Sequence, residues 1–339
     1  MEPVIMPLSV IGPVMPTASI PHPAGRPLNW PLLAISFALL AYAVMCWRWG
    51  GTVEDSQAYY DTARYLRGEL AASELRAPFP YRLLVPAAAS IMPGELRNGF
   101  ALLNWLLVVA GACCMSAAVL RAGLDHRRAI AAGLLMIVSL PTFWYAPYLL
   151  VDPGSIAARA AFVLALLSGQ PWLAALAGLL GSAIREENVL LLVWLVATRQ
   201  IAVLPGLAFL AAAGGWMVLV RWHLITGLPS YTWQPNVGTV MAALRDVRSL
   251  ASIAGAAILV VPLAIVGWRR APAPLRPLAG LLLLMALPQL YAALSVRVEG
   301  RLIWGLYPFL VPFAVCVGLT PAVRATPPDS SRSIPETRG

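Results

Sequence analysis

The chain has 339 residues, of which 60% are hydrophobic and only 12% are charged. A soluble protein of this size needs more surface charge, and the alternating pattern of an outer-membrane barrel is missing, so the sequence predicts an all-α polytopic membrane protein. The net charge is +9, which fits cytoplasmic arginine anchors beside anionic lipid and does not suggest nucleic-acid binding. Lysine is absent, which is most simply explained by a GC-rich coding bias.

One transmembrane domain is expected between two tails. Residues 1–30 are rich in proline and methionine, which predicts a disordered cytoplasmic tail. We expect the first apolar segment to be retained as a helix rather than removed as a signal peptide. The transmembrane domain covers 31–320, with an outer-face loop at 50–98. Residues 321–339 form a second disordered cytoplasmic tail.

Ten apolar runs follow one another within this domain. They are 31–49, 99–120, 129–149, 155–169, 171–184, 188–198, 200–221, 250–268, 277–296 and 302–320. A membrane-spanning helix needs ~20 residues, and most of the runs qualify. The runs 171–184 and 188–198 are too short, and the charged stretch "REEN" separates them.

The two short runs allow two interpretations. They form either one long helix with its charges near the middle of the membrane, or two short helices with the charges at the turn. With two helices, the arginine-rich loops 121–128 and 268–277 lie on the cytoplasmic side, as the positive-inside rule requires. We therefore predict about ten membrane segments, including two short helices, with both chain ends in the cytoplasm.

Polar residues collect on the opposite, outer face in this topology. They occupy the stretches 53–82, 149–155, 185–188 and 296–301, which the loop 222–248 joins. The aromatic residues of that loop suit either sugar stacking or anchoring at the membrane interface, and they are Trp222, Tyr231 and Trp233. The distribution predicts a single polar site that faces outward.

The stretch "VEDSQAYYDTARYLRGEL" begins this outer face at Val53. Its spacing predicts an amphipathic helix over 56–68 with an apolar stripe of Ala63, Leu66 and Leu70. A short apolar helix is expected over 82–92, bounded by a proline. The alternative interpretation is an ordinary interfacial helix, with its tyrosines at the membrane boundary and its arginines on lipid phosphates.

Asp55 and Glu54 stand where this surface helix begins. A carboxylate is stabilised at a helix N-terminus by the helix dipole and by capping. Such a carboxylate is also able to take a proton from a hydroxyl group. Asp55 is the first candidate for a catalytic base and Glu54 is the alternative.

Several motifs, in their order along the chain, resemble the GT-C superfamily of membrane glycosyltransferases, which use polyprenyl-phosphate sugars. The resemblance rests on "EDSQAYYDTARYLRG" followed by "PFPYRLLVP", and on "VDPGS", "AIREENVLLL" and "EGRLIWGLYPFLVP". It covers most of residues 31–320. The chain departs from the family pattern in two ways: no soluble C-terminal domain follows, and Arg185 stands at the usual lysine of the mid-chain turn.

The resemblance implies an inverting glycosyltransferase of the plasma (inner) membrane, with its active site on the outer, periplasmic face. It implies a polyprenyl-phosphate sugar donor and a lipid or glycan acceptor, in envelope glycan or glycolipid synthesis. Arginine binds phosphate with a planar and permanently charged fork, and the candidates for the donor phosphate are Arg82, Arg185, Arg297 and Arg301. The candidates for contacts to the acceptor or sugar are Tyr59, Tyr60, Asp152, Glu186 and Glu299.

Several of these acids have alternative roles. Asp152 either orients the acceptor, helps to bind a divalent metal, or caps the helix that starts near Pro153; the metal requirement is left open, and no other cofactor is expected. Glu186, together with Glu187, is expected to neutralise Arg185. Glu299 is expected to pair with Arg297 or Arg301.

Two other functions fit the same composition. A membrane transporter also has many helices with internal charges, although its binding site usually lies near the middle of the membrane. A non-catalytic partner in envelope polysaccharide assembly would keep the fold without needing Asp55.

Overall fold

The computed structural model describes residues 28–229 and 234–319, and these ranges are helical, with one isolated β-bridge between Gly51 and Tyr148. The tails predicted for 1–30 and 321–339 lie outside the described residues, apart from 28–30. Tyr231 and Trp233 also lie outside them.

Helices occupy all ten apolar runs. The main helices are α1 (Trp30–Met45), α2 (Asp55–Leu66), α3 (Leu84–Ser90), α4 (Leu96–Arg121), α5 (His126–Ile137), α6 (Leu140–Tyr145), α7 (Asp152–Leu167), α8 (Pro171–Ile184), α9 (Val189–Ala197), α10 (Val203–Leu219), α11 (Val237–Ala243), α12 (Val247–Ala257), α13 (Val260–Trp268), α14 (Pro277–Ser295), α15 (Gly300–Trp304) and α16 (Tyr307–Ala314). Only α11, inside the predicted loop 222–248, was not expected as a helix.

Polar residues at the edges of the apolar runs fix where several of these helices begin. Asn29, Asp125, Ser139 and Asp246 each accept a hydrogen bond from a backbone N–H in the first turn of the helix that follows. Such caps satisfy N–H groups that have no partner within the helix. Short polar side chains in the turns between the apolar runs therefore fix where these helices begin.

Six helical segments are long and apolar enough to cross a membrane. They are Trp30–Arg48, Leu96–Arg121, His126–Tyr145, Val203–Leu224, Val247–Trp268 and Ala273–Ser295. The prediction of a polytopic all-α membrane protein is confirmed at this level. The remaining four runs form α7, α8, α9 and the pair α15–α16, which are shorter than the ~20 residues of a regular span. The number of ten spans therefore stays a prediction.

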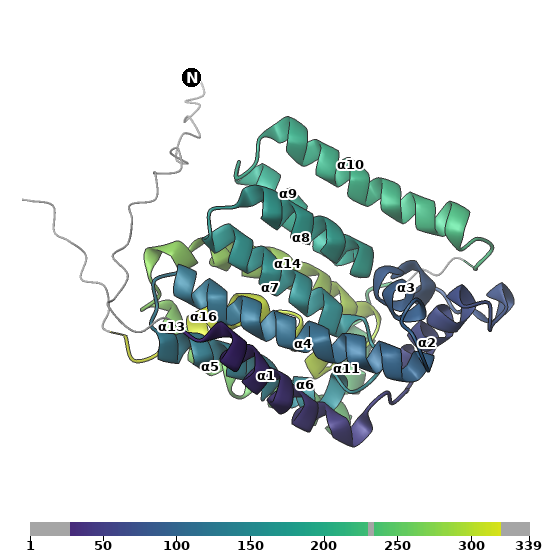
Figure 1. The fold of residues 1–339 in the computed structure, drawn as a ribbon, viewed down its shortest axis with the longest axis horizontal. Helices are drawn as coiled ribbons and strands as arrows, with labels where there is room; N and C mark the ends of the chain where they lie inside the picture. The colour runs from purple at the N-terminus through teal and green to yellow at the C-terminus, as the bar shows by residue number, and fades with distance from the viewer. Residues whose placement is uncertain (1–27, 230–233, 320–339) are drawn as a thin grey trace, which may run out of the picture.

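The long helices run side by side, with α2 and α3 at one end of the bundle (Figure 1). The two short runs form a hairpin, because a Cβ atom at Gly178 of α8 would lie 2.9 Å from the Leu192 side chain of α9. A turn of 3₁₀-helix, η4 (Glu186–Asn188), joins them. Arg185 at this turn bonds Asp152, so the turn and the start of α7 lie at the same end of the bundle.

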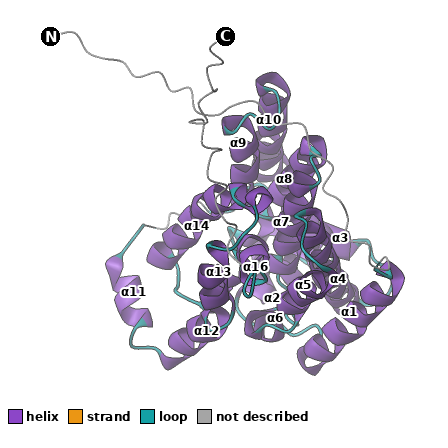
Figure 2. Cartoon of the chain, turned by 90° about the vertical axis from the view of Figure 1, so that its left-hand side faces the viewer, coloured by secondary structure: helices purple, strands orange, loops and turns teal. Residues whose placement is uncertain are grey.

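Helix α16 lies in the middle of the bundle. All eight of its residues are buried, and it packs against α4, α5, α7, α13 and α14. Viewed from the end, α1 and α4 lie on one side of α16 and α11 and α12 on the other (Figure 2). The last helix of the described residues is therefore the core around which the earlier helices pack.

The surface helix α2 begins one residue earlier than predicted, and its buried face shares only Ala63 with the predicted stripe. Its buried residues are Ser56, Ala58, Tyr59, Thr62 and Ala63, whereas Leu66 of the predicted stripe is exposed. The short helix predicted at 82–92 is α3. Arg67, just after α2, donates to backbone carbonyl groups at and beyond the end of α3, which ties the two helices together.

A close helix crossing generates the first prediction. A Cβ atom added at Gly267 of α13 would overlap the backbone carbonyl oxygen of Phe313 in α16. Gly267→Ala should therefore destabilise the protein, by about 1–3 kcal/mol if the crossing behaves like other overpacked sites. The measurement is thermal unfolding of the purified protein in detergent. Gly215→Ala in α10 is the matched control, because nothing lies within 4 Å of its added Cβ. An equal loss of stability in both variants would contradict the crossing.

The second prediction concerns the direction of the chain. Single cysteines should be introduced at Ala71, Gln170 and Ala273, three exposed positions, in a variant without the four native cysteines. Ala71 lies in the segment between α2 and α3, whereas Gln170 precedes α8 and Ala273 follows α13, at the far end of the bundle (Figure 1). A membrane-impermeant thiol reagent should label the first from one side of the membrane and the other two from the opposite side. Labelling of Ala273 from the same side as Ala71 would contradict the α8–α9 hairpin.

Candidate functional site

A cavity of about 1190 Å³ lies at the end of the bundle where α2 and the α8–α9 turn meet. Its lining combines seven arginines, five carboxylates and six aromatic rings. The charged lining residues are Arg48, Arg82, Arg185, Arg221, Arg248, Arg297, Arg301, Glu54, Asp55, Glu186, Glu187 and Glu299. Segments that are distant in the sequence thus contribute to one site.

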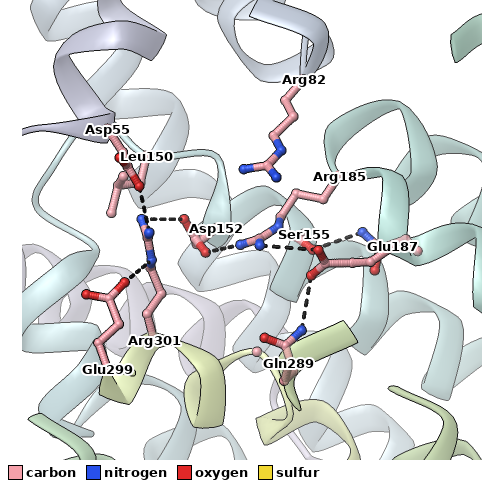
Figure 3. A network of polar contacts seen from close by, with 12 residues as sticks. Asp55, Arg82, Leu150, Asp152, Ser155, Arg185, Glu187, Gln289, Glu299 and Arg301 are labelled. Atoms are coloured by element: carbon pink, nitrogen blue, oxygen red, sulfur yellow. Dashed lines mark hydrogen bonds and ion pairs between the residues drawn. The ribbon is translucent and has the colours of Figure 1, made fainter. Parts of the chain in front are cut away.

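Asp152 is the centre of the polar network (Figure 3). It lies at the first position of α7 and is 4% exposed. Its Oδ1 atom accepts a hydrogen bond from Arg185, and its Oδ2 atom lies 3.7 Å from Nη1 of Arg301. One buried carboxylate therefore holds two arginines, one from the middle and one from the late part of the chain.

Arg301 connects this centre to the predicted catalytic carboxylate. Its Nη2 atom donates to Oδ2 of Asp55 at 2.7 Å, and its Nε atom lies 2.8 Å from Glu299. The predicted pairing of Glu299 with one of the two late arginines is confirmed for Arg301. Oδ1 of Asp55 has no hydrogen-bond partner among residues 28–229 and 234–319. The side chain of Asp55 is 30% exposed. The bond from Arg301 therefore fixes this carboxylate, while a ligand in the cavity can still reach it.

Glu187 carries a second cluster at the α8–α9 turn. It lies 3.2 Å from Arg185 and 2.7 Å from Arg159, and it also accepts from Gln289. Burial alone would raise the pKa of the Glu187 carboxyl, but Arg185 and Arg159 outweigh that effect and hold the pKa well below its usual range. Glu187 therefore neutralises Arg185, as the sequence suggested, while Glu186 does not contact Arg185.

Glu186 instead belongs to the part of the site next to α2. Arg82 lies 3.1 Å from Glu186 and donates to the Tyr59 hydroxyl at 2.7 Å. Arg221 approaches the same glutamate at 3.3 Å. Burial raises the pKa of the Tyr59 hydroxyl, which favours the neutral phenol as the acceptor for Arg82.

The structure separates the two adjacent tyrosines of α2. Tyr59 is 1% exposed and does not line the cavity itself, but it accepts a hydrogen bond from the lining residue Arg82. It packs inside the protein, which rules out a position in a membrane-interface belt. Tyr60 lies under the guanidinium of Arg97, 4.8 Å from ring centroid to Cζ, and is not part of the cavity lining. The structure thus gives no support to Tyr60 as a contact for acceptor or sugar.

Glu54 and Arg297 lie at the exposed rim. Their side chains are 3.3 Å apart, and that of Glu54 is 75% exposed. The backbone of Glu54 has a φ of 40°, which is rare for a residue with a side chain. Strain of this kind costs about 1–3 kcal/mol and clusters at functional sites. The strained residue Glu54 lies directly before Asp55, where α2 begins.

Two buried residues of the network were missed from the sequence. Arg159 is 1% exposed in α7 and donates to Asn188 and to the carbonyl of Gly305, besides pairing with Glu187. Gln289 of α14 donates to Glu187. The signal that could have found Arg159 is its position as a lone charge inside an apolar run, which is costly unless the charge is paired.

The arrangement combines permanent cations with a carboxylate that keeps a free oxygen. Such a site can bind an anionic group and accept a proton within one cavity. The described residues contain no group of three or more His, Cys, Asp and Glu side chains that could hold a metal ion. Comparisons of the chain with family models, curated proteins and solved structures find no match.

The Glu187 cluster generates the third prediction. Glu187→Ala would leave Arg159 with an unbalanced buried charge, while Arg185 would keep Asp152. Breaking a buried pair typically costs 3–5 kcal/mol, so we expect a loss of about that size in thermal or denaturant unfolding. Glu54→Ala removes an exposed pair and should change stability little. Similar losses in the two variants would show that the buried cluster has no special weight.

The same cluster predicts a pH dependence. The pKa of Glu187 is lower in the folded protein than in the unfolded chain, where it is about 4.3. Its stabilisation is therefore complete above that unfolded value and is lost as the pH falls below it. Unfolding midpoints measured between neutral and acid pH should fall less steeply for Glu187→Gln than for the wild type.

Proposed function

We propose that this protein is a membrane glycosyltransferase of the GT-C type, which moves a sugar from a polyprenyl-phosphate donor to an acceptor on the outer face of the plasma (inner) membrane. In this proposal the chain has ten membrane segments with both ends in the cytoplasm. The acceptor is a lipid or a glycan of the cell envelope.

One observation carries the proposal. Asp55 and all four arginines proposed for the donor phosphate line the same cavity, at one end of a bundle of apolar helices. A lipid-linked sugar has its phosphate and sugar at the end of a membrane-embedded chain. In the proposal, its reactive atoms therefore lie near the membrane surface, at the end of the bundle that holds the cavity. Aromatic rings in the lining, among them Tyr81 and Trp144, offer faces for a sugar.

The proposed reaction is a direct displacement. Asp55 takes the proton from the acceptor hydroxyl through Oδ1 while Arg301 holds Oδ2. The acceptor oxygen forms a bond to the anomeric carbon, and the bond from that carbon to the phosphate oxygen breaks. Polyprenyl phosphate leaves with the bonding electrons, and the configuration of the sugar inverts. Arg82 and Arg185 are the proposed partners of the leaving phosphate.

A second candidate function is transport. The buried pair of Arg159 and Glu187 favours it, because charges inside a helical membrane bundle often mark a substrate or ion pathway. A transporter would move its substrate without forming a glycosidic bond. It would also have no requirement for a base at Asp55.

The fifth prediction tests the transfer directly. Purified protein in proteoliposomes receives a radiolabelled polyprenyl-phosphate sugar and a membrane-lipid or glycan acceptor fraction, and the labelled product is measured. Asp55→Asn keeps the size of the side chain and removes its basicity, so transfer should fall by about 10²–10⁴-fold. Asp61→Asn is the matched control on the same helix, because Asp61 bonds Gln57 and is not part of the cavity lining.

The outcomes separate the alternatives. Loss of transfer in Glu54→Gln with full activity in Asp55→Asn would move the base to Glu54. Full activity in both variants would contradict the catalytic interpretation of this stretch. Uptake of label into the vesicles without a glycosylated product would favour the transporter.

A further inference from the structure

The arginines that line the cavity differ in whether a carboxylate neutralises them. Five of the seven have a carboxylate within 4 Å, and these are Arg82, Arg185, Arg221, Arg297 and Arg301. The guanidinium groups of Arg48 and Arg248 form no ion pair within that distance among residues 28–229 and 234–319, although the backbone N–H of Arg248 donates to Asp246. The uncompensated positive charge of the described lining is therefore carried by these two side chains.

Aromatic rings hold Arg48 in place. Its guanidinium lies 4.0 Å from the ring centroid of Trp47 and within 6 Å of those of Trp144 and Tyr148, and it donates to the Tyr148 hydroxyl. This bond uses one Nη1 donor, and the Nε and Nη2 atoms have no hydrogen-bond partner among the described residues. A guanidinium stacked in this way is ordered before a ligand arrives, which lowers the entropic cost of binding.

Arg248 lines the same cavity from another helix. It lies in the first turn of α12, and α12 packs against α6, which carries Trp144 and Tyr145. Arg248, Ser249 and Ser252 of α12 line the cavity together with Trp144 and Tyr148. The lining therefore contains two unneutralised cations, Arg48 beside its aromatic rings and Arg248 on α12. Helix α12 also packs against α15, which carries Arg301.

We propose that Arg48 and Arg248, with Trp144 and Tyr148, form a subsite for an anionic group of the acceptor, and that this group is a phosphate. Two uncompensated guanidinium groups match the charge of about −1.5 to −2 that a phosphate monoester carries at pH 7. The aromatic rings beside them suit the sugar that bears the phosphate. The word acceptor rests on the proposed function, while the binding of phosphate at Arg48 does not.

The test uses the purified full-length protein and two probes, inorganic phosphate and farnesyl phosphate, with binding measured by thermal shift and by isothermal titration. Inorganic phosphate represents the acceptor group, and farnesyl phosphate represents the lipid-linked donor. Arg48→Gln and Arg248→Gln should weaken the binding of inorganic phosphate by roughly 10-fold to 100-fold, the weight of a charge-assisted hydrogen bond. Both variants should bind farnesyl phosphate as the wild type does.

Two control variants separate a specific effect of Arg48 from a general loss of positive charge. Arg64→Gln removes a surface arginine that pairs with Asp61 outside the cavity lining, and it should bind both probes normally. Arg48→Lys keeps the charge without the planar fork, and it should bind inorganic phosphate more weakly than the wild type and more tightly than Arg48→Gln. An unshifted unfolding temperature without ligand shows that each variant is folded.

Three results would overturn the inference. Wild-type protein that is not stabilised by millimolar phosphate lacks the subsite. Normal phosphate binding in Arg48→Gln and Arg248→Gln would assign the anion to the neutralised arginines. Equal loss of both probes in these variants would assign the subsite to the donor instead of the acceptor. The glycosyl-transfer assay of Asp55→Asn is independent of all three, so failure of the subsite and failure of the proposed function are distinguishable.

Discussion

Two arginines from distant parts of the chain meet on the carboxylate of Asp152, and the polar end of the protein depends on that contact. It ties the start of α7 to the α8–α9 turn and to α15. Charges removed from water are stable only when they are paired and hydrogen-bonded, and breaking one member of such a set leaves the others uncompensated. The network is therefore a single unit. Arg301 and Arg185, which both pair with Asp152, also fix the positions of Asp55 and Glu187.

Much of the helical fold could be predicted from the sequence, because the length of an apolar run and a capping residue are local properties. The hairpin of α8 and α9 follows from charges that cannot remain in the middle of one helix, together with the arginine distribution. The apolar stripe predicted for α2 was right for Ala63, which is buried, and wrong for Leu66, which is exposed. Packing of α2 against α3 and the neighbouring 3₁₀ turn buries Tyr59 in addition. That choice depends on tertiary contacts that a local pattern does not contain.

The members of the site were easier to predict than their partners. The acids and arginines at the ends of the apolar runs had to gather at one face, but which arginine meets which acid depends on how segments distant in the sequence pack together. The pairing of Arg159 could not be predicted from the sequence, because its partners Glu187, Asn188 and Gly305 come from two other segments. In the described structure, carboxylates of the protein occupy all four arginines assigned to the donor phosphate. A donor that binds there has to exchange these partners or join them.

All basic side chains in the described lining of the cavity are arginines. A guanidinium keeps its proton to above about pH 12, so the positive charge of these arginines is constant over the whole physiological pH range. A phosphate monoester gains its second negative charge near pH 6. The ionisation state of a phosphate-bearing ligand, rather than any titration of these cations, would then set how strongly the cavity attracts it, and acidification of the surrounding medium would loosen the complex from the ligand's side.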